Sequence, residues 1–71
     1  MNLPQMIQVQ SRNVNSVGHD GQNLFVKFNN GSIYTYSGVP ASVFQELLNA
    51  PSKGKFLHYR IKGAYPDTRI V

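Results

Sequence analysis

Two β-rich runs flank an Asn30-Gly31 pair near the middle of the chain, within the stretch Phe25–Tyr36. An Asn-Gly pair between such runs is a strong β-hairpin signal, because both residues tolerate the positive φ that a two-residue turn requires. If these two residues form the turn, Phe28 pairs with Ile33. The sequence therefore predicts a hairpin around which the rest of the chain is arranged.

This register divides the side chains of the hairpin between two faces, because successive residues of a strand point to opposite sides of a sheet. One face is apolar and is expected to be core: Leu24, Val26, Phe28, Ile33 and Thr35. The other is aromatic with one cation: Phe25, Lys27, Tyr34 and Tyr36. Exposed aromatic rings on a sheet can stack on unpaired bases. Alternatively, a helix covers this second face and the tyrosines are amphipathic core residues.

A further strand is expected before the hairpin, since the turn sequence 19–23 contains Asp20-Gly21. Together these segments predict a three-stranded antiparallel meander over residues 13–19, 23–29 and 32–37. Val14 and Val17 would fall on opposite faces of a straight strand. Either Gly18 marks a β-bulge or the register of this strand is unusual.

Two helices are expected to follow the meander. Residues 41–50 carry an apolar stripe that begins after Pro40 and ends before Pro51. Ser52 is a candidate N-cap for a second helix over about 53–62, which Gly63 would end. The same segment can be interpreted as a strand, because Leu57, Tyr59 and Ile61 alternate; helix is the preferred interpretation. As a helix it presents an outer face formed by Lys55, Tyr59 and Lys62.

The predicted fold class is therefore α+β: a three-stranded antiparallel β-meander followed by two short helices packed on one face. We expect one domain over residues 1–71, with its core at about 11–65, a loose N-terminus and a C-terminal tail that packs through Tyr65. The chain has no cysteine, which excludes disulfides and thiolate metal sites. No apolar run approaches the length of a membrane span, so a cytoplasmic protein without a membrane partner is expected.

The net charge of +4 is concentrated in one segment. Residues 1–50 and residues 66–71 are each neutral overall, so four residues hold the whole excess: Lys53, Lys55, Arg60 and Lys62. A local basic segment suits a polyanion or an acidic partner, although a solvated surface that keeps a small protein soluble is the alternative interpretation.

Catalytic groups are few. The carboxylates are Asp20, Glu46 and Asp67, and the histidines are His19 and His58. Their spacing matches no metal site and no nucleophile–base pair. The sequence therefore predicts a protein that is not an enzyme and needs no cofactor.

The motifs of the hairpin are similar to those of the KTSC domain family, a short module at the C-terminus of some lysyl-tRNA synthetases that also occurs as a single-domain protein in bacteria and phages. The family's mark is a Phe-x-Asn-Gly run before Tyr-x-Tyr, here Phe28–Gly31 and Tyr34-Thr35-Tyr36. Further shared features are Val17-Gly18-His19-Asp20, where His19 replaces an aromatic residue, the Val39-Pro40 helix start, the Ala50-x-Ser52-x-Gly54 junction and the Ile61-x-x-x-Tyr65 ending. The resemblance covers about residues 11–65, and the synthetase context implies RNA binding.

These observations favour a small RNA-binding or nucleic-acid-associated module, with RNA such as tRNA as its partner. The candidate nucleic-acid-binding residues are Phe25, Lys27, Tyr34, Tyr36, Lys53, Lys55, Tyr59, Arg60 and Lys62. The alternative is a protein-interaction module, such as a phage or bacterial accessory protein, that uses the same surface on an acidic partner. The oligomeric state is left open.

Overall fold

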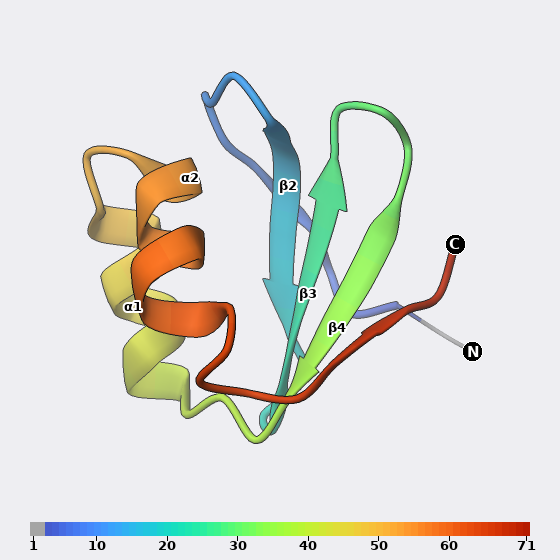
Figure 1. The fold of residues 1–71 in the computed structure, drawn as a ribbon, viewed down its shortest axis with the longest axis vertical. Helices are drawn as coiled ribbons and strands as arrows, with labels where there is room; N and C mark the ends of the chain where they lie inside the picture. Colours follow the sequence, from blue (N-terminus) through green and yellow to red (C-terminus); the bar gives the residue numbers. More distant parts are fainter. Residues whose placement is uncertain (1–2) are drawn as a thin grey trace.

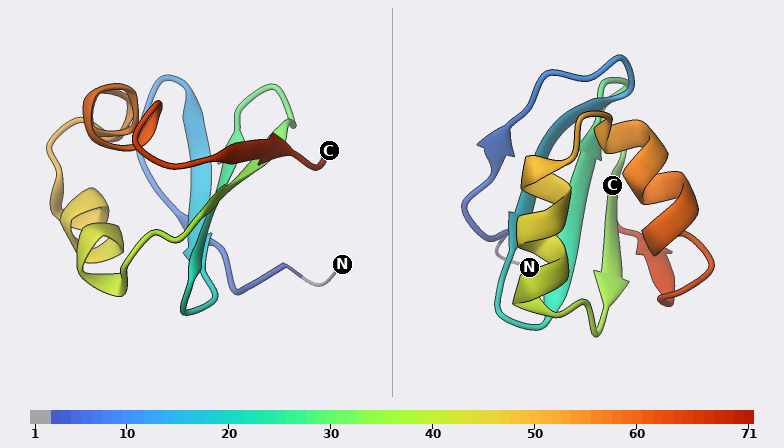
Figure 2. Two further views of the ribbon diagram at one scale, coloured as in Figure 1. Left: turned by 60° about the horizontal axis from the view of Figure 1, so that its bottom comes forward. Right: turned by 90° about the vertical axis from the view of Figure 1, so that its left-hand side faces the viewer.

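The computed structural model describes residues 3–71, which form a five-stranded antiparallel sheet with helices on one face (Figures 1 and 2). The strands follow chain order in the sheet: β1 (Ile7–Gln8), β2 (Val14–His19), β3 (Asn23–Phe28), β4 (Ile33–Ser37) and β5 (Asp67–Arg69). Between β4 and β5 the chain forms α1 (Ala41–Asn49), α2 (Lys53–Phe56) and η1 (Leu57–Ile61). The α+β class is confirmed, as are the central meander and the helices on one face, but β1 and β5 add two edge strands.

The turn of the central hairpin differs from the predicted one. The Phe28 N–H donates to the Ser32 carbonyl at 2.8 Å, and the Gly31 N–H donates to the Phe28 carbonyl at 2.9 Å. Gly31 has a φ of +92°, whereas no non-glycine residue within 3–71 has a positive φ. The connection is therefore a three-residue loop, Asn29–Gly31, in which only the glycine adopts the left-handed conformation.

The longer loop shifts β4 by one residue against β3. Val26 pairs with Tyr34 and Leu24 pairs with Tyr36, where the two-residue turn had paired Val26 with Thr35. A shift of one residue moves every side chain of a strand to the other face. The predicted division of the faces was therefore wrong for β4. The helix-covered face carries Leu24, Val26, Phe28, Tyr34 and Tyr36, and the opposite face carries Phe25, Lys27, Ile33 and Thr35.

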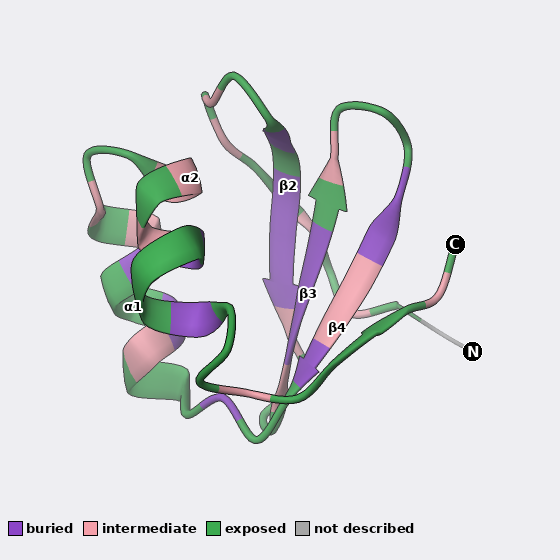
Figure 3. Cartoon of the chain, viewed as in Figure 1, coloured by how far each residue is buried: buried purple, intermediate pink, exposed green. Residues whose placement is uncertain are grey.

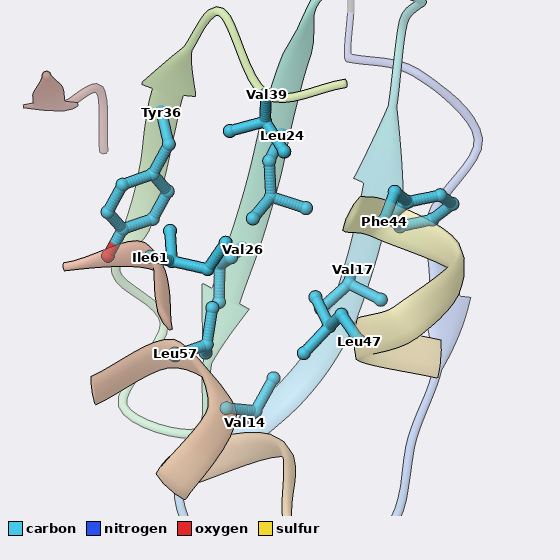
Figure 4. Close-up of a cluster of buried hydrophobic side chains, with 10 residues drawn as sticks. All are labelled: Val14, Val17, Leu24, Val26, Tyr36, Val39, Phe44, Leu47, Leu57 and Ile61. Carbon is cyan, nitrogen blue, oxygen red and sulfur yellow. The ribbon is translucent and has the colours of Figure 1, made fainter. Parts of the chain in front are cut away.

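The core lies between this sheet face and the helices, and buried residues are concentrated on β2, β3 and β4 (Figure 3). The sheet contributes Val14, Val17, Leu24, Val26 and Tyr36 to the cluster, and the helical side contributes Val39, Phe44, Leu47, Leu57 and Ile61 (Figure 4). Val14 and Val17 share one face because the pairing shifts between Val14 and Ser16, which leaves Asn15 as the extra residue of a β-bulge. The bulge is thus at Asn15 and not at Gly18.

The segment from Lys53 to Ile61 is helical, which confirms the preferred interpretation over the strand. Ser52 Oγ accepts the Lys55 N–H at 3.3 Å and so caps α2. The helix widens in its last turn, η1, because the Lys62 N–H donates to the Leu57 carbonyl five residues earlier, at 2.7 Å. Leu57 and Ile61 face the core from this turn.

Gly18 lies where the N-terminal segment crosses the sheet. A Cβ atom at this position would lie 2.7 Å from Met6 Sδ and 2.8 Å from the Gln5 carbonyl oxygen. No side chain fits there without displacing backbone, so Gly18 is needed for the close approach of Pro4–Met6. Of the N-terminal residues expected to be loose, Met1 and Asn2 lie outside the described residues.

His19, at the end of β2, occupies an aromatic position. Its ring stacks on Phe44 with 5.3 Å between the ring centroids and 20° between the planes. Nδ1 accepts the Gly21 N–H at 3.1 Å, which leaves Nε2 to donate to the Val39 carbonyl at 2.6 Å. The histidine therefore packs as an aromatic ring would and also ties β2 to the start of α1.

The predicted C-terminal tail is a strand. Asp67 pairs with Tyr36 and Arg69 pairs with Tyr34, while the Ser37 N–H donates to the Pro66 carbonyl at 2.9 Å. The segment has few apolar residues, so its pattern did not indicate a strand; it is held by the ladder of β4 rather than by burial. This pairing extends the sheet beside the second helical segment.

Candidate functional site

A hollow of about 530 Å³ lies between the sheet and the second helical segment. Phe28, Tyr34 and Tyr36 form an aromatic wall on the sheet side. The rest of its lining consists of Asn13, Val14, Asn30 and Ser32, then Gly54, Leu57, His58 and Lys62 from the helical side, and Asp67 and Arg69 from β5. The hollow thus combines aromatic carbon, amide and hydroxyl groups and charges of both signs.

A second hollow, of about 400 Å³, adjoins the first. The two share Asn13, Gly54 and His58 in their linings. The second is otherwise lined by the loop Gln10–Arg12 and by Pro51, Ser52, Lys53, Lys55 and Tyr59. We call the two together the basic trough. It runs along the second helical segment, from the loop before β2 to β5.

The aromatic residues of the trough differ in how open they are. Tyr36 is 5% exposed and Tyr34 is half-buried, with its ring edge-on to Phe28 at 5.6 Å between centroids. Burial, and then the nearby Asp67 carboxylate, raise the pKa of the Tyr36 hydroxyl above its ordinary value. Tyr59, in contrast, is 76% exposed and meets the His58 ring edge-on at 4.8 Å. Tyr59 is therefore the most open aromatic ring of the trough.

The basic trough collects the net charge of the chain. Five cations and one carboxylate line it: Arg12, Lys53, Lys55, Lys62 and Arg69, with Asp67. The two remaining cations are balanced by the two remaining carboxylates. Arg60 pairs with Glu46 at 3.3 Å, and Lys27 and Asp20 lie elsewhere on the surface. The whole excess of +4 therefore faces this one surface.

Some of these side chains already have a structural partner. Lys53 Nζ donates to the Ala50 carbonyl at 2.7 Å, which fixes it at the C-terminal end of α1. Arg69 Nε donates to the Val71 carbonyl at 2.9 Å. Arg60 lines neither hollow. Its Cζ atom lies 5.2 Å from the centroid of the Phe56 ring, and its Nη2 donates to Glu46 Oε1.

The structure brings most of the candidate residues together. Six of the nine line the basic trough: Tyr34, Tyr36, Lys53, Lys55, Tyr59 and Lys62. Phe25, 4% exposed, and Lys27 lie on the opposite face of the sheet, and Arg60 is occupied by Glu46. The predicted aromatic platform of Phe25 and Lys27 with the tyrosines does not exist, because the shifted register separates them.

Sequence reasoning missed several lining residues. Arg69 and Asp67 were assigned to a tail, and only the β4–β5 pairing places them at the hollow. Arg12 reaches the trough through the loop before β2, which is far from the basic segment in sequence. A search for charge alone would have found both arginines, but not their location.

Neither a metal centre nor a membrane span is indicated in residues 3–71. No group of three or more histidine or carboxylate side chains in this part of the chain could hold a metal ion. No helix in the same range is long and apolar enough to cross a membrane. The arrangement that is present suits the binding of phosphates and flat rings.

Residues 10–65 match the family model of the KTSC domain. The chain belongs to the KTSC family. The crystal structure of a KTSC domain protein from Yersinia pestis has a TM-score of 0.87 to this chain at 34% identity, over 94% of this chain and 97% of that one. At this identity and coverage, the two chains share the KTSC fold.

Lysine–tRNA ligases from Nostoc sp. and Trichormus variabilis are 52% and 50% identical to this chain over 44 residues. The match is 62% of this chain but only 8% of each ligase. A protein of Stutzerimonas stutzeri is 36% identical over 58 residues, with 82% of its length covered. KTSC domains thus occur within lysine–tRNA ligases and also in chains of about this size.

Proposed function

We propose that this chain is a non-enzymatic module that binds single-stranded RNA in the basic trough. The observation that carries the proposal is the collection of the entire excess positive charge beside an open tyrosine ring. The similarity to lysine–tRNA ligases, whose name states an RNA substrate, supports RNA as the polyanion. The module belongs in the cytoplasm on this proposal.

The phosphates are bound by the cations of the trough. Each phosphate that a lysine or arginine neutralises releases condensed counterions, so log affinity falls with log salt by about 0.7 per contact for a single strand. Five cations line the trough, and one carboxylate opposes them. The plot of log affinity against log salt is therefore expected to be no steeper than about −3.5. The affinity is modest, as suits an auxiliary module.

Tyr59 supplies the base contact. Its ring is 76% exposed, and Lys53, Lys55 and Arg12 line the same hollow. Stacking of one base on an exposed aromatic ring contributes roughly 1–3 kcal/mol and is sequence-tolerant. A ring beside several cations is the arrangement by which single strands are bound through both base and backbone.

Fluorescence anisotropy with a labelled ten-nucleotide oligoribonucleotide at low salt tests the proposal. We expect Lys55→Ala and Tyr59→Ala each to weaken binding about fivefold or more, in line with the loss of one phosphate or stacking contact. Lys27→Ala is the matched control, because Lys27 is exposed on the opposite face of the sheet. An equal effect of all three variants, or no RNA binding by the unaltered chain, would contradict the proposal.

The competing hypothesis is an acidic protein partner on the same surface. It predicts that a pull-down with the chain returns one protein in stoichiometric amount and that nuclease treatment does not remove it. Loss of the captured material on nuclease treatment, together with oligonucleotide binding in the anisotropy titration, favours RNA.

A further inference from the structure

Asp67 is the carboxylate of a hollow otherwise lined by cations, aromatic rings and neutral polar groups. It lies on β5, pairs with Tyr36 and is exposed. Within residues 3–71 its carboxylate forms no ion pair and accepts no hydrogen bond. Arg69, two residues further along the same strand, donates to the Val71 carbonyl instead. The Asp67 oxygens are thus free acceptors at the wall of the 530 Å³ hollow.

A free carboxylate here works against phosphate binding, because it repels the backbone of any polyanion in the trough. The Asp67 carboxylate also disfavours ionisation of the Tyr36 hydroxyl, because both groups line the same hollow and would carry like charges. A negative group in this position is useful to a ligand only if the ligand presents N–H donors to it.

On the basis of the RNA-binding function proposed above, we propose that the hollow beside Tyr36 is a pocket for one unpaired guanine base, with Asp67 as the residue that determines specificity. Guanine carries N1–H and the N2 amino group side by side, so both carboxylate oxygens accept a hydrogen bond. Adenine and cytosine place a ring acceptor beside their amino group, and uracil places carbonyls beside N3–H. The carboxylate repels those acceptors.

The remaining walls fit the same ligand. The half-buried rings of Phe28 and Tyr34 supply the aromatic surface for the base, to which the nearly buried Tyr36 adds little. Lys62 and Arg69 lie on the lining where the flanking phosphates would follow. The volume of about 530 Å³ is within the range of pockets that hold small ligands. The neighbouring hollow with Tyr59 then takes an adjacent nucleotide without base preference.

The test is anisotropy with labelled uridine hexamers that carry guanine, inosine, adenine, cytosine or uracil at one central position. We expect the guanine hexamer to bind about 5- to 20-fold more tightly than all-uridine, as a bidentate base contact at a partly open site does. Inosine, which lacks the N2 amino group, should bind with intermediate affinity. Asp67→Asn should bring the ratio to within about twofold, and all-uridine binding should stay equal or become tighter because a repulsive charge is lost.

Glu46→Gln is the matched control, because it removes one exposed carboxylate away from the trough; it should preserve the guanine preference. Melting curves confirm that both variants are folded. Equal binding of all five hexamers, or a guanine preference that survives in Asp67→Asn, would overturn the guanine pocket and leave RNA binding intact. Absence of binding to every hexamer would overturn the RNA-binding function together with it.

Discussion

Tyr34 pairs with Val26 across β3 and β4, so its ring lies on the sheet face that the helices cover. The pairing depends on the three-residue loop in which Gly31 is left-handed, at φ +92°. With Tyr34 and Tyr36 on this face, the aromatic residues of β4 and the cations of the second helical segment line one surface. The turn residue thus determines where the candidate site can form.

The left-handed conformation of Gly31 is tested by Gly31→Ala. A Cβ atom in the left-handed region costs roughly 1–2 kcal/mol, although nothing within 4 Å would contact it. The variant should therefore lower the free energy of unfolding by about that amount, measured by urea denaturation.

Gly54→Ala is the control for this experiment. Gly54 lies in α2 and has no positive φ, and a Cβ atom added to it would meet no other atom within 4 Å. Alanine there should be neutral or stabilise by about 0.5–1 kcal/mol. Similar destabilisation by both substitutions would contradict the left-handed conformation of Gly31.

A second prediction concerns the N-terminal segment. Gly18→Ala should destabilise the chain by roughly 1–3 kcal/mol, because the new methyl group overlaps the Gln5 carbonyl and Met6 Sδ. Amide exchange at Val9, whose N–H donates to the Asn15 carbonyl, should accelerate as β1 separates from β2.

The cause of this loss of stability can be tested in a chain that lacks residues 1–6. In that background Gly18→Ala should cost little, because the atoms it overlaps are gone. An undiminished loss in the shortened chain would show that the N-terminal segment is not what requires glycine at this position.

A third prediction follows from the raised pKa of Tyr36. Its ordinary value is 10.0, and burial and the Asp67 carboxylate favour the neutral phenol in the folded chain. Between the unfolded and the folded pKa the folded state holds the extra proton, so stability falls as the pH rises through that interval. Below this pH interval, the contribution of Tyr36 to the free energy of unfolding is fully present.

Tyrosinate absorbance against pH measures this directly. Tyr36→Phe should remove absorbance from the alkaline end of the curve. Asp67→Asn should move the ionisation of Tyr36 to lower pH, since the repulsive charge is lost. If the alkaline end of the curve is unchanged in both variants, Tyr36 is not buried beside Asp67 as described.

The sequence was sufficient to predict the elements with strong local signals. The stripe of α1 between Pro40 and Pro51 and the cap at Ser52 both specify helices through local chemistry. The Asn30-Gly31 pair identified a hairpin correctly. It did not distinguish a two-residue turn from a three-residue turn, because Gly31 serves either one.

The predicted faces of Tyr34 and Tyr36 depended on this difference of one residue in loop length. It therefore accounts for most of the error at the site. Asp67 and Arg69 were missed for a different reason. A short, fully exposed edge strand has no apolar alternation to reveal it, and only its pairing with β4 shows where it lies. Long-range pairing of this kind is not encoded in local pattern.

The most direct test of RNA binding in the basic trough is a chemical-shift titration of the isotope-labelled chain with an oligoribonucleotide at low salt. We expect the perturbed amides to cluster at the basic trough, at Tyr59, Lys62 and Arg69, and those of Lys27 and Thr35 on the opposite face to stay unchanged. Perturbations centred on Lys27 and Thr35, or none at all, would contradict this location of the site.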